Sequence, residues 1–167
     1  MLQLRWYAVY VRSRSEKVVF SRISEQGIET YLPLQKTLRQ WHDRKKLVEL
    51  PLFNSYVFVR ANSTQFQLIK STEGVSGFVS FDGKPAKIPD SQINYLKLLL
   101  DSSEKFEISY DIFEFGDKVE VFRGPLKGFK GFLVDYKGIK RALLQINAIN
   151  QSLIVEIHPS NLKKVDE

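Results

Sequence analysis

The stretch from Leu50 to Arg60, Leu-Pro-Leu-Phe-Asn-Ser-Tyr-Val-Phe-Val-Arg, decides the fold, because it combines an apolar strand with aromatic rings. Successive side chains of a strand point to opposite faces, so Val57 and Val59 share one face. The other face carries Tyr56, Phe58 and Arg60, and Phe53 precedes the strand. Two interpretations are open: a strand buried on both faces, or an aromatic face left open for a protein partner.

The residues around this stretch predict strands and helices in alternation up to about residue 102. Apolar and alternating runs indicate strands at residues 4–11, 28–32 and 74–81, with a protruding hairpin at 34–50. Helices are expected after Ser13, after Asn62 and after Pro89. We therefore predict the α+β class, with an N-terminal α/β sandwich of a small, mainly antiparallel sheet and about three helices.

The start of the first expected helix carries a capping signal. Ser13-Arg14-Ser15-Glu16 has the Ser-x-x-Glu spacing of a capping box, in which each side chain satisfies an amide that the first turn leaves free. Gly27 is expected to end the helix in the left-handed conformation.

The tip of the expected hairpin, near His42-Asp43-Arg44-Lys45, is strongly basic. Its cations are Lys36, Arg39, Arg44, Lys45 and Lys46, against Asp43 and Glu49. A solvated charge run is the commoner explanation of such a cluster. Trp41 favours contact with nucleic acid instead, because aromatic rings stack on unpaired bases and cations neutralise phosphates.

Composition and charge limit the class of protein. The 167 residues are 43% hydrophobic with a net charge of +6 and contain no cysteine, so we expect a globular protein without disulfides or thiol chemistry. Residues 1–110 hold 16 Lys and Arg against 11 Asp and Glu, whereas residues 111–167 hold nine against eight. A basic first part favours a polyanionic partner. No apolar run is long enough to span a bilayer, and we expect a cytoplasmic protein.

The second part of the chain predicts only strands, at 118–122, 131–136, 141–146, 152–157 and 162–165. Five short strands suggest a small SH3-like β-barrel. Its glycine-rich motif consists of Gly116, Asp117, Gly124, Pro125, Lys127, Gly128 and Gly131, and it lacks the Gly-Lys-Ser/Thr ending of a phosphate-binding loop. Pro125 alone would cost a helix interior roughly 3 kcal/mol, so we expect this part to stay β. The expected domains are residues 1–105 and 114–167, with a linker at 106–113.

Several runs, in this order, resemble the NusG-like transcription elongation factors, in which an N-terminal NGN domain is joined to a C-terminal KOW domain. The runs are Trp6-Tyr7, Pro51-Leu52-Phe53, Tyr56-Val57-Phe58-Val59, Gly74-Val75-Ser76-Gly77-Phe78-Val79, and the Gly-Asp-x-Val and Gly-Pro-Leu-Lys-Gly-x-x-Gly motifs of the second part. The resemblance covers nearly the whole chain. It is greatest to the specialised RfaH and UpxY types, because Asn54-Ser55-Tyr56 replaces the Pro-Gly-Tyr common in housekeeping members.

This resemblance implies a partner and a mechanism. It implies a hydrophobic pocket on the NGN domain that binds the clamp helices of the largest RNA polymerase subunit and so suppresses pausing and termination, at specific operons such as surface-polysaccharide loci. The matching positions are Phe53, Tyr56, Phe58 and Phe66. A neighbouring segment, Gln65, Phe66 and Gln67, matches the part that reaches the opposite side of the polymerase cleft.

The resemblance also implies contact with the non-template DNA strand or the nascent RNA. The matching residues are Arg12, Arg14, Ser15, Arg22 and Thr72, and Glu73 departs from the basic residue of the RfaH type. For the KOW domain the resemblance implies a small-subunit ribosomal protein or termination factor Rho as partner. Phe122, Leu126 and Phe129 are apolar candidates for that contact, or for the core of the barrel.

Two other functions remain open from the residues. KOW-type barrels also occur in ribosomal proteins, so a ribosome-binding or RNA-binding module without polymerase contact is the first alternative. An enzyme is the second, but His42 and His158 have neither the spacing of a metal site nor that of a catalytic triad. We expect a monomer without enzymatic activity, cofactor, metal or membrane contact.

Overall fold

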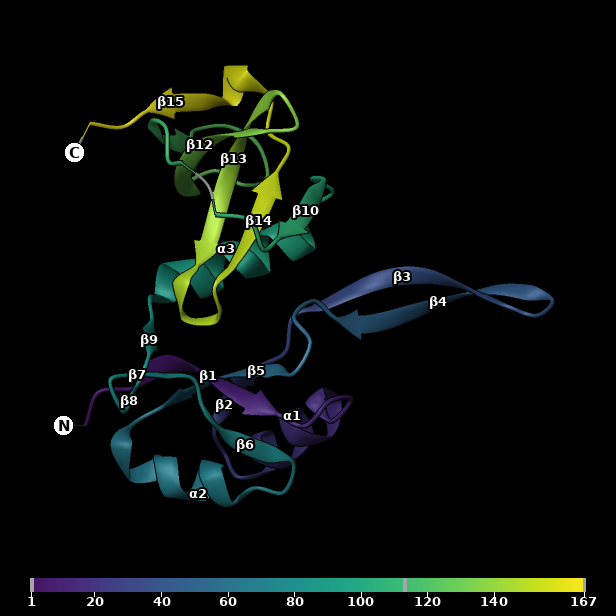
Figure 1. The fold of residues 1–167 in the computed structure, drawn as a ribbon, viewed down its shortest axis with the longest axis vertical. Coiled ribbons are helices and arrows are strands. Elements are labelled where there is room, and N and C mark those ends of the chain that lie inside the picture. Colours follow the sequence, from purple (N-terminus) through teal and green to yellow (C-terminus); the bar gives the residue numbers. More distant parts are fainter. Residues whose placement is uncertain (1, 113, 167) are drawn as a thin grey trace. The chain divides into compact units, whose positions relative to one another are not determined.

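The structure, a computed structural model, describes residues 2–112 and 114–166. It divides into two compact units, residues 1–90 and 91–167. Figure 1 shows the strands and helices of both. The α+β class predicted from the sequence is confirmed, and the described residues contain three α-helices.

The first unit is built on an antiparallel sheet whose central strand is β1, Arg5–Val11. β1 pairs along most of its length with β5, Tyr56–Ala61, in the register Ala8↔Phe58. The sheet order is β2-β5-β1-β6, and β9 also pairs with β1. The shorter strands are β2 (Glu29–Tyr31), β6 (Val75–Phe78) and β9 (Lys87–Ile88).

One face of this sheet packs on two helices, α1 (Glu16–Glu25) and α2 (Phe66–Ser71). Their buried residues Val19, Ile23 and Ile69 form one core with alternate residues of β1 and β5, among them Val57 and Val59. Figure 1 shows both helices on the same side of the sheet. Gly27, with a φ of 77°, follows α1 in the left-handed conformation, as predicted.

A hairpin of β3 (Leu34–Trp41) and β4 (Arg44–Pro51) extends from the sheet of the first unit, as expected from the sequence. His42 and Asp43 form its turn. A smaller hairpin joins β7 (Ser80–Phe81) to β8 (Lys84–Pro85) through Asp82-Gly83, both with positive φ, as two-residue hairpin turns require. A short 3₁₀ helix, Ser63–Gln65, precedes α2.

The second unit begins with α3 (Asp90–Asp101) and continues with an antiparallel sheet in the order β10-β14-β13-β12-β11-β15. The strands are β10 (Phe106–Ser109), β11 (Lys118–Val121), β12 (Lys130–Tyr136), β13 (Ile139–Ile146), β14 (Gln151–Val155) and β15 (Leu162–Lys164). Short 3₁₀ helices lie at Asn147–Ile149 and Pro159–Asn161. The strands predicted between residues 118 and 165 are all present, and this part is β, as expected.

The division between the units falls earlier than the boundary drawn from the sequence. Residues 106–109, expected within a linker, form β10 and pair with β14 in the register Phe106↔Val155. Within the second unit the ring of Tyr95 on α3 lies 5.1 Å from the ring of Phe129. Leu126 and Phe129 are buried, so they belong to the core of this unit and not to an exposed apolar patch.

Candidate functional site

The aromatic face of β5 is largely closed in this structure. Phe58 is fully buried, and its ring packs edge-on against Phe53 at 6.2 Å and beside Tyr31 at 6.4 Å. Phe53 is buried as well. With Val57 and Val59 also buried, β5 is a strand enclosed on both faces, the first of the two interpretations.

An aromatic pair remains accessible beside these buried rings. Tyr56 is half-buried, and its ring meets the ring of Tyr10 edge-on at 5.2 Å between centroids. The two residues are register partners on β5 and β1, and Tyr10 is 48% exposed. Tyr10 was not among the predicted site residues, although its place in the first strand opposite Tyr56 follows once the two strands are paired.

The segment that begins α2 divides into structural and exposed residues. Phe66 packs against Tyr7 at 5.1 Å and Phe78 at 4.8 Å, so its ring belongs to the core. The side chain of Gln65 accepts the backbone N–H of Asn62 and completes a capping box. Gln67 is exposed.

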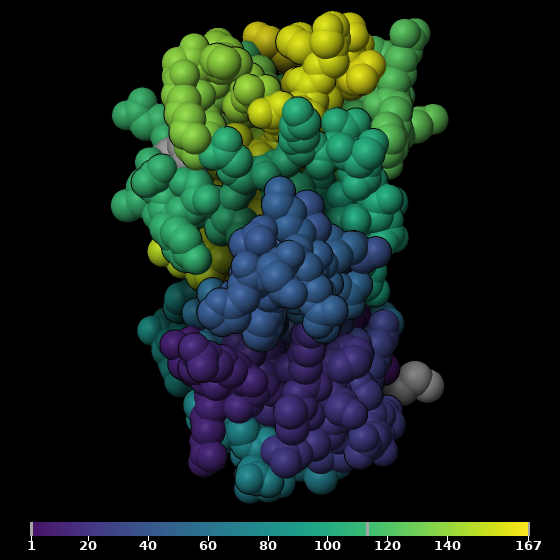
Figure 2. All heavy atoms as spheres, turned by 90° about the vertical axis from the view of Figure 1, so that its right-hand side faces the viewer, coloured from purple at the N-terminus to yellow at the C-terminus, as the bar shows by residue number. Residues whose placement is uncertain are grey.

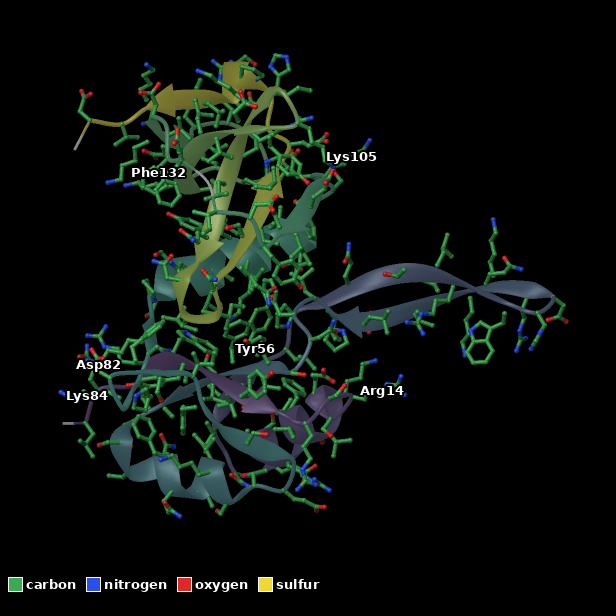
Figure 3. All side chains as sticks on the ribbon, viewed as in Figure 1. Arg14, Tyr56, Asp82, Lys84, Lys105 and Phe132 are labelled. Atoms are coloured by element: carbon green, nitrogen blue, oxygen red, sulfur yellow. The ribbon has the colours of Figure 1, made fainter. Side chains whose placement is uncertain are left out.

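The turn between β1 and α1 does not form the predicted capping box. Ser15 is the N-cap of α1, and its side chain makes no capping hydrogen bond. The carboxylate of Glu16 instead accepts the backbone N–H of Ser55 at 2.8 Å, and Glu16 is buried. Arg12 and Arg14 are both exposed in this turn. Figure 3 shows Arg14 on the side of the first unit from which the hairpin extends.

Two of the residues matched to nucleic-acid contact are engaged within the chain. Arg22 forms an ion pair of 3.2 Å with Glu73 and donates to the Glu73 carbonyl oxygen at 2.8 Å. Thr72 is buried, accepts a hydrogen bond from Gln26 and donates one to the Leu68 carbonyl oxygen. Glu73, the departure noted in the sequence, thus neutralises the cation beside it.

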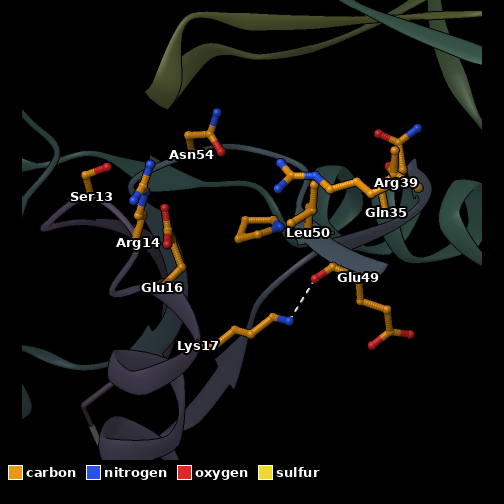
Figure 4. A pocket seen from close by; sticks show the side chains of 11 residues that line it. Ser13, Arg14, Glu16, Lys17, Gln35, Arg39, Glu49, Leu50 and Asn54 are labelled. Carbon is orange, nitrogen blue, oxygen red and sulfur yellow. Dashed lines mark hydrogen bonds between the residues drawn. The ribbon is translucent and has the colours of Figure 1, made fainter. Parts of the chain in front are cut away.

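A polar cavity of about 830 Å³ lies between the β1–α1 turn and the base of the hairpin. Its lining residues are Ser13, Arg14, Glu16, Lys17, Gln35, Thr37, Arg39, Glu49, Leu50, Pro51 and Asn54. The ammonium group of Lys17 donates to the Glu49 carbonyl oxygen at 2.7 Å and so ties α1 to β4. Figure 4 shows the Arg39 guanidinium directed into the cavity and the Glu49 carboxylate directed away from it.

The hairpin carries a group of exposed cations. All its residues from Gln35 to Leu47 are exposed. In Figure 2, where colour marks position in the sequence, the hairpin is the blue group of spheres that lies uncovered at the front. Within residues 2–112 and 114–166, no ion pair involves Lys36, Arg39, Arg44, Lys45 or Lys46. Trp41 is 56% exposed. The structure thus leaves the predicted hairpin cations and Arg14 accessible.

The glycine-rich motif of the second unit serves its fold. Gly128 has a φ of 91°, which glycine adopts without strain, and a Cβ at Gly131 would overlap the carbonyl oxygen of Leu143 on β13. Lys164 on β15 lies 2.8 Å from Asp117 and, by hydrogen bonding, lowers the pKa of that carboxyl group below its ordinary value of 3.8. Gly128 of the motif therefore permits the turn before β12, and Gly131 permits the close pairing of β12 with β13.

Two further kinds of feature, a metal-binding cluster and a membrane-spanning helix, are absent from residues 2–112 and 114–166. No group of three or more acidic or histidine side chains there is arranged to hold a metal ion. No helix there has both the length and the apolar character needed to cross a bilayer.

Known proteins resemble this chain along its length. A family model described as "Transcription termination factor nusG" matches residues 4–97. The transcription termination/antitermination protein NusG of Pseudomonas aeruginosa is 28% identical over 176 residues, covering 96% of this chain and 98% of the relative. NusG of Campylobacter jejuni is 26% identical, covering 96% and 97%.

A solved structure described as "Domain interaction in Thermotoga maritima NusG" has the same fold. It aligns with a TM-score of 0.55 at 24% identity, over 98% of each chain. Because the family model spans more than half of the residues, the chain belongs to the NusG family of transcription elongation and antitermination factors, which are not enzymes.

Proposed function

We propose that this transcription factor binds the clamp helices of the largest subunit of bacterial RNA polymerase and so suppresses pausing and termination. The observation that supports this most directly is the accessible ring pair of Tyr10 and Tyr56. It lies at the position where the resemblance to NusG-like factors implies the clamp-helix site. Aromatic side chains are favoured anchors of interfaces, because they bury a large area at little cost in conformational entropy.

The buried rings behind this pair have a supporting role in the proposal. Phe58 lies on the same face of β5 as Tyr56 and is held by Phe53. A well-packed layer of this kind fixes the position of an exposed anchor, so a partner helix would meet a rigid surface. Phe53 and Phe58 would then act through Tyr56 and not by direct contact.

A second contact with the polymerase would come from the start of α2. Phe66 is fixed in the core, which positions the exposed Gln67 beside it. Gln65 is committed to the capping box. Gln67 is therefore the residue of this segment that we assign to the opposite side of the cleft.

Nucleic acid of the transcription complex, the non-template DNA strand or the nascent RNA, is the other proposed partner. The exposed Arg12 and Arg14 and the hairpin cations support this proposal, because unpaired cations release condensed counterions when they meet phosphates. We further propose action at specific operons, such as surface-polysaccharide loci, on the resemblance to the specialised branch.

The second unit is proposed to recruit a further partner, a small-subunit ribosomal protein or Rho. Leu126 and Phe129 are buried, so they do not supply this surface. Phe115 is exposed, and its ring lies 4.7 Å from that of Phe132. This pair is the aromatic surface that we assign to the contact.

Binding of the full chain to core RNA polymerase tests the central proposal. We expect the parent to bind and the double variant Tyr10→Ala, Tyr56→Ala to lose at least tenfold in affinity, as hot-spot residues do when truncated. Phe53→Ala is unsuitable, because removing a buried ring costs about 3–5 kcal/mol of stability.

Phe81→Ala is the matched control for this experiment. Phe81 is 61% exposed on the β7–β8 hairpin of the same unit. Equal loss with Phe81→Ala would contradict an assignment to the tyrosine pair. Failure of the parent to bind would favour the ribosomal alternative.

Footprinting on a paused elongation complex tests the contact with nucleic acid. We expect Arg12→Ala with Arg14→Asn to weaken recruitment to specific leaders and to spare polymerase binding. Asn is chosen because Arg14 has a φ of 63°, which Asn tolerates better than Ala. Equal recruitment of this variant and the parent would contradict the assignment.

A further inference from the structure

The register of the β3–β4 hairpin separates its residues into two unlike faces. Cross-strand partners share a face and successive residues alternate. The pairs Arg39↔Lys46 and Trp41↔Arg44 therefore lie on one face, which we call the Trp41 face. Leu38↔Leu47 and Lys36↔Glu49 lie on the other, the Leu38 face.

The Trp41 face places like charges directly opposite each other. Arg39 and Lys46 are register partners, an arrangement that destabilises a strand pair. The single acidic strand residue, Glu49, belongs to the Leu38 face, where it faces Lys36. An anionic ligand on the Trp41 face would relieve this repulsion, so the hairpin is more stable when that face is occupied.

Trp41 adds an apolar plane at the end of this row of cations. Its indole is 56% exposed, and Arg44 is its register partner across the hairpin. An exposed indole beside a guanidinium offers a surface for a nucleobase, because every base has a π-face that can stack on a ring. Paired bases inside a duplex are not available for such stacking, so this plane favours an unpaired strand.

The Trp41 face continues into the polar cavity at the base of the hairpin. Gln35, Thr37 and Arg39 belong to that face and also line the cavity. Across the cavity lie Ser13, Arg14 and Asn54. From Gln35 to Trp41 the strand spans about 20 Å at about 3.4 Å per residue, the length of about six stacked nucleotides.

The two acidic residues that line the cavity, Glu16 and Glu49, repel a bound phosphate group only weakly. Glu16 is buried and accepts the N–H of Ser55, and the carboxylate of Glu49 is directed away from the cavity. By contrast, the cation Arg22 on α1 is already paired with Glu73. The accessible positive charge of this region is therefore on the side of the hairpin.

We propose that an unpaired nucleic-acid strand binds along the Trp41 face, from the cavity at Arg14 to the indole of Trp41. Arg14, Arg39 and Lys46 contact phosphates, and Trp41 stacks on a base. This inference deepens the proposed function, since a transcription complex exposes such strands. It does not depend on the tyrosine pair or on polymerase, because the site lies wholly within this chain.

Titration of the full chain with labelled oligonucleotides tests the proposal. The probes are a single-stranded DNA of mixed sequence, an RNA of the same sequence and the DNA duplex. We expect Trp41→Ala to weaken single-strand binding about 5- to 150-fold, as loss of one stacked base does. Arg39→Gln with Lys46→Gln should reduce the slope of log affinity against log salt by about 1.4.

Matched controls are available for both variants. Lys84→Gln with Lys87→Gln removes the same charge from exposed positions of the same unit outside the hairpin, and Leu38→Ala truncates an exposed apolar residue opposite Leu47 on the Leu38 face. We expect both controls to bind within about twofold of the parent. Equal losses from the variants and their controls, or parental affinity of Trp41→Ala, would overturn the proposal.

Tryptophan fluorescence gives a direct readout of stacking. The chain has two tryptophans, and Trp6 is 4% exposed, so a ligand-induced change reports on Trp41. Quenching by a single strand and not by the duplex is expected, whereas equal quenching by the duplex contradicts stacking. If the DNA strand binds more tightly than the RNA strand, the natural ligand is DNA, and the reverse order indicates RNA. A chain that binds a single strand on the Trp41 face but does not bind polymerase would refute only the clamp-helix proposal.

Discussion

Ser55 holds the loop before β5 in the left-handed conformation, with a φ of 66°. Its backbone N–H donates to the buried Glu16 carboxylate, which fixes this conformation. Glycine adopts such a φ without strain. The loop thus has a conformation suited to glycine although serine occupies the position.

Ser55→Gly is expected to stabilise the protein by about 1 kcal/mol, the cost of a non-glycine residue in this conformation. The measurement is the free energy of unfolding in urea. Ser24→Gly, in the last turn of α1, is the control and should destabilise by about 0.5 kcal/mol. A destabilised Ser55→Gly would mean that the serine side chain itself holds the loop.

Asp117 gives the second unit a dependence on pH. Lys164 lowers the pKa of Asp117 by hydrogen bonding, so the stabilisation is present above the unfolded value of 3.8 and lost as pH falls through the folded value. We expect Asp117→Asn to be less stable than the parent at neutral pH, with the difference vanishing in acid. The measurement is the free energy of unfolding of the parent and of Asp117→Asn, at neutral pH and in acid. A difference in stability that persists in acid would exclude the ion pair with Lys164 as its cause.

At the scale of elements, the β3–β4 hairpin is separable from the core of its unit. The register pair Trp41↔Arg44 flanks the turn, and the pair Thr37↔Val48 lies on the same face of the hairpin, four residues further from the turn. Replacing residues 38–47 by Asn-Gly therefore shortens the hairpin without changing which residues share a face.

We expect this shortened chain to keep the parental free energy of unfolding to within about 0.5 kcal/mol, because the deleted residues are exposed. Binding of single-stranded DNA should be lost. Circular dichroism and the oligonucleotide titration check the two expectations. Unfolding of the shortened chain would show that the hairpin supports the sheet.

Local sequence patterns predicted where the strands and helices of this chain lie better than they predicted which residues those elements contact. The loose, charged pattern of residues 34–50 was interpreted correctly as a protruding hairpin, and Gly27 predicted the end of α1. The capping box at Ser13 failed because Glu16 bonds to Ser55, which is distant in sequence. Alternation also assigned Phe58 to a face of β5, but what packs on a face depends on non-local contacts such as that with Phe53.

The candidate site was predictable in its residue types and less so in its geometry. The cations near Trp41 were evident from the sequence, but their division between two faces required the register of β3 and β4. Residues 106–109, Phe-Glu-Ile-Ser, alternate between apolar and polar as a strand does, but nothing in them indicated that their partner would be β14. Tyr10 and Lys17 were missed because their roles come from neighbours that lie far along the chain.

For the whole molecule, net charge is confined to one unit. Residues 1–90 hold 14 Lys and Arg against eight Asp and Glu, a net +6, whereas residues 91–167 hold 11 of each. A positive field on one unit steers it toward a polyanion and leaves the other unit neutral for a different partner.

We expect the salt dependence of nucleic-acid binding to follow this division. Lys130→Gln with Lys140→Gln, two exposed changes in the second unit, should leave the salt slope unchanged. The matched change of Arg39 and Lys46 should reduce it. Equal reductions, measured by titration at several salt concentrations, would place the polyanion on both units.

The β3–β4 hairpin also bears on how the protein behaves in a crowded solution. Among the described residues β3 and β4 pair only with each other, so each has an edge whose backbone groups can pair with another chain. Lysine and arginine side chains along such edges keep copies apart by mutual repulsion. The hairpin cations therefore also act as gatekeepers against self-association, and a variant that neutralises all of them should aggregate as its concentration rises.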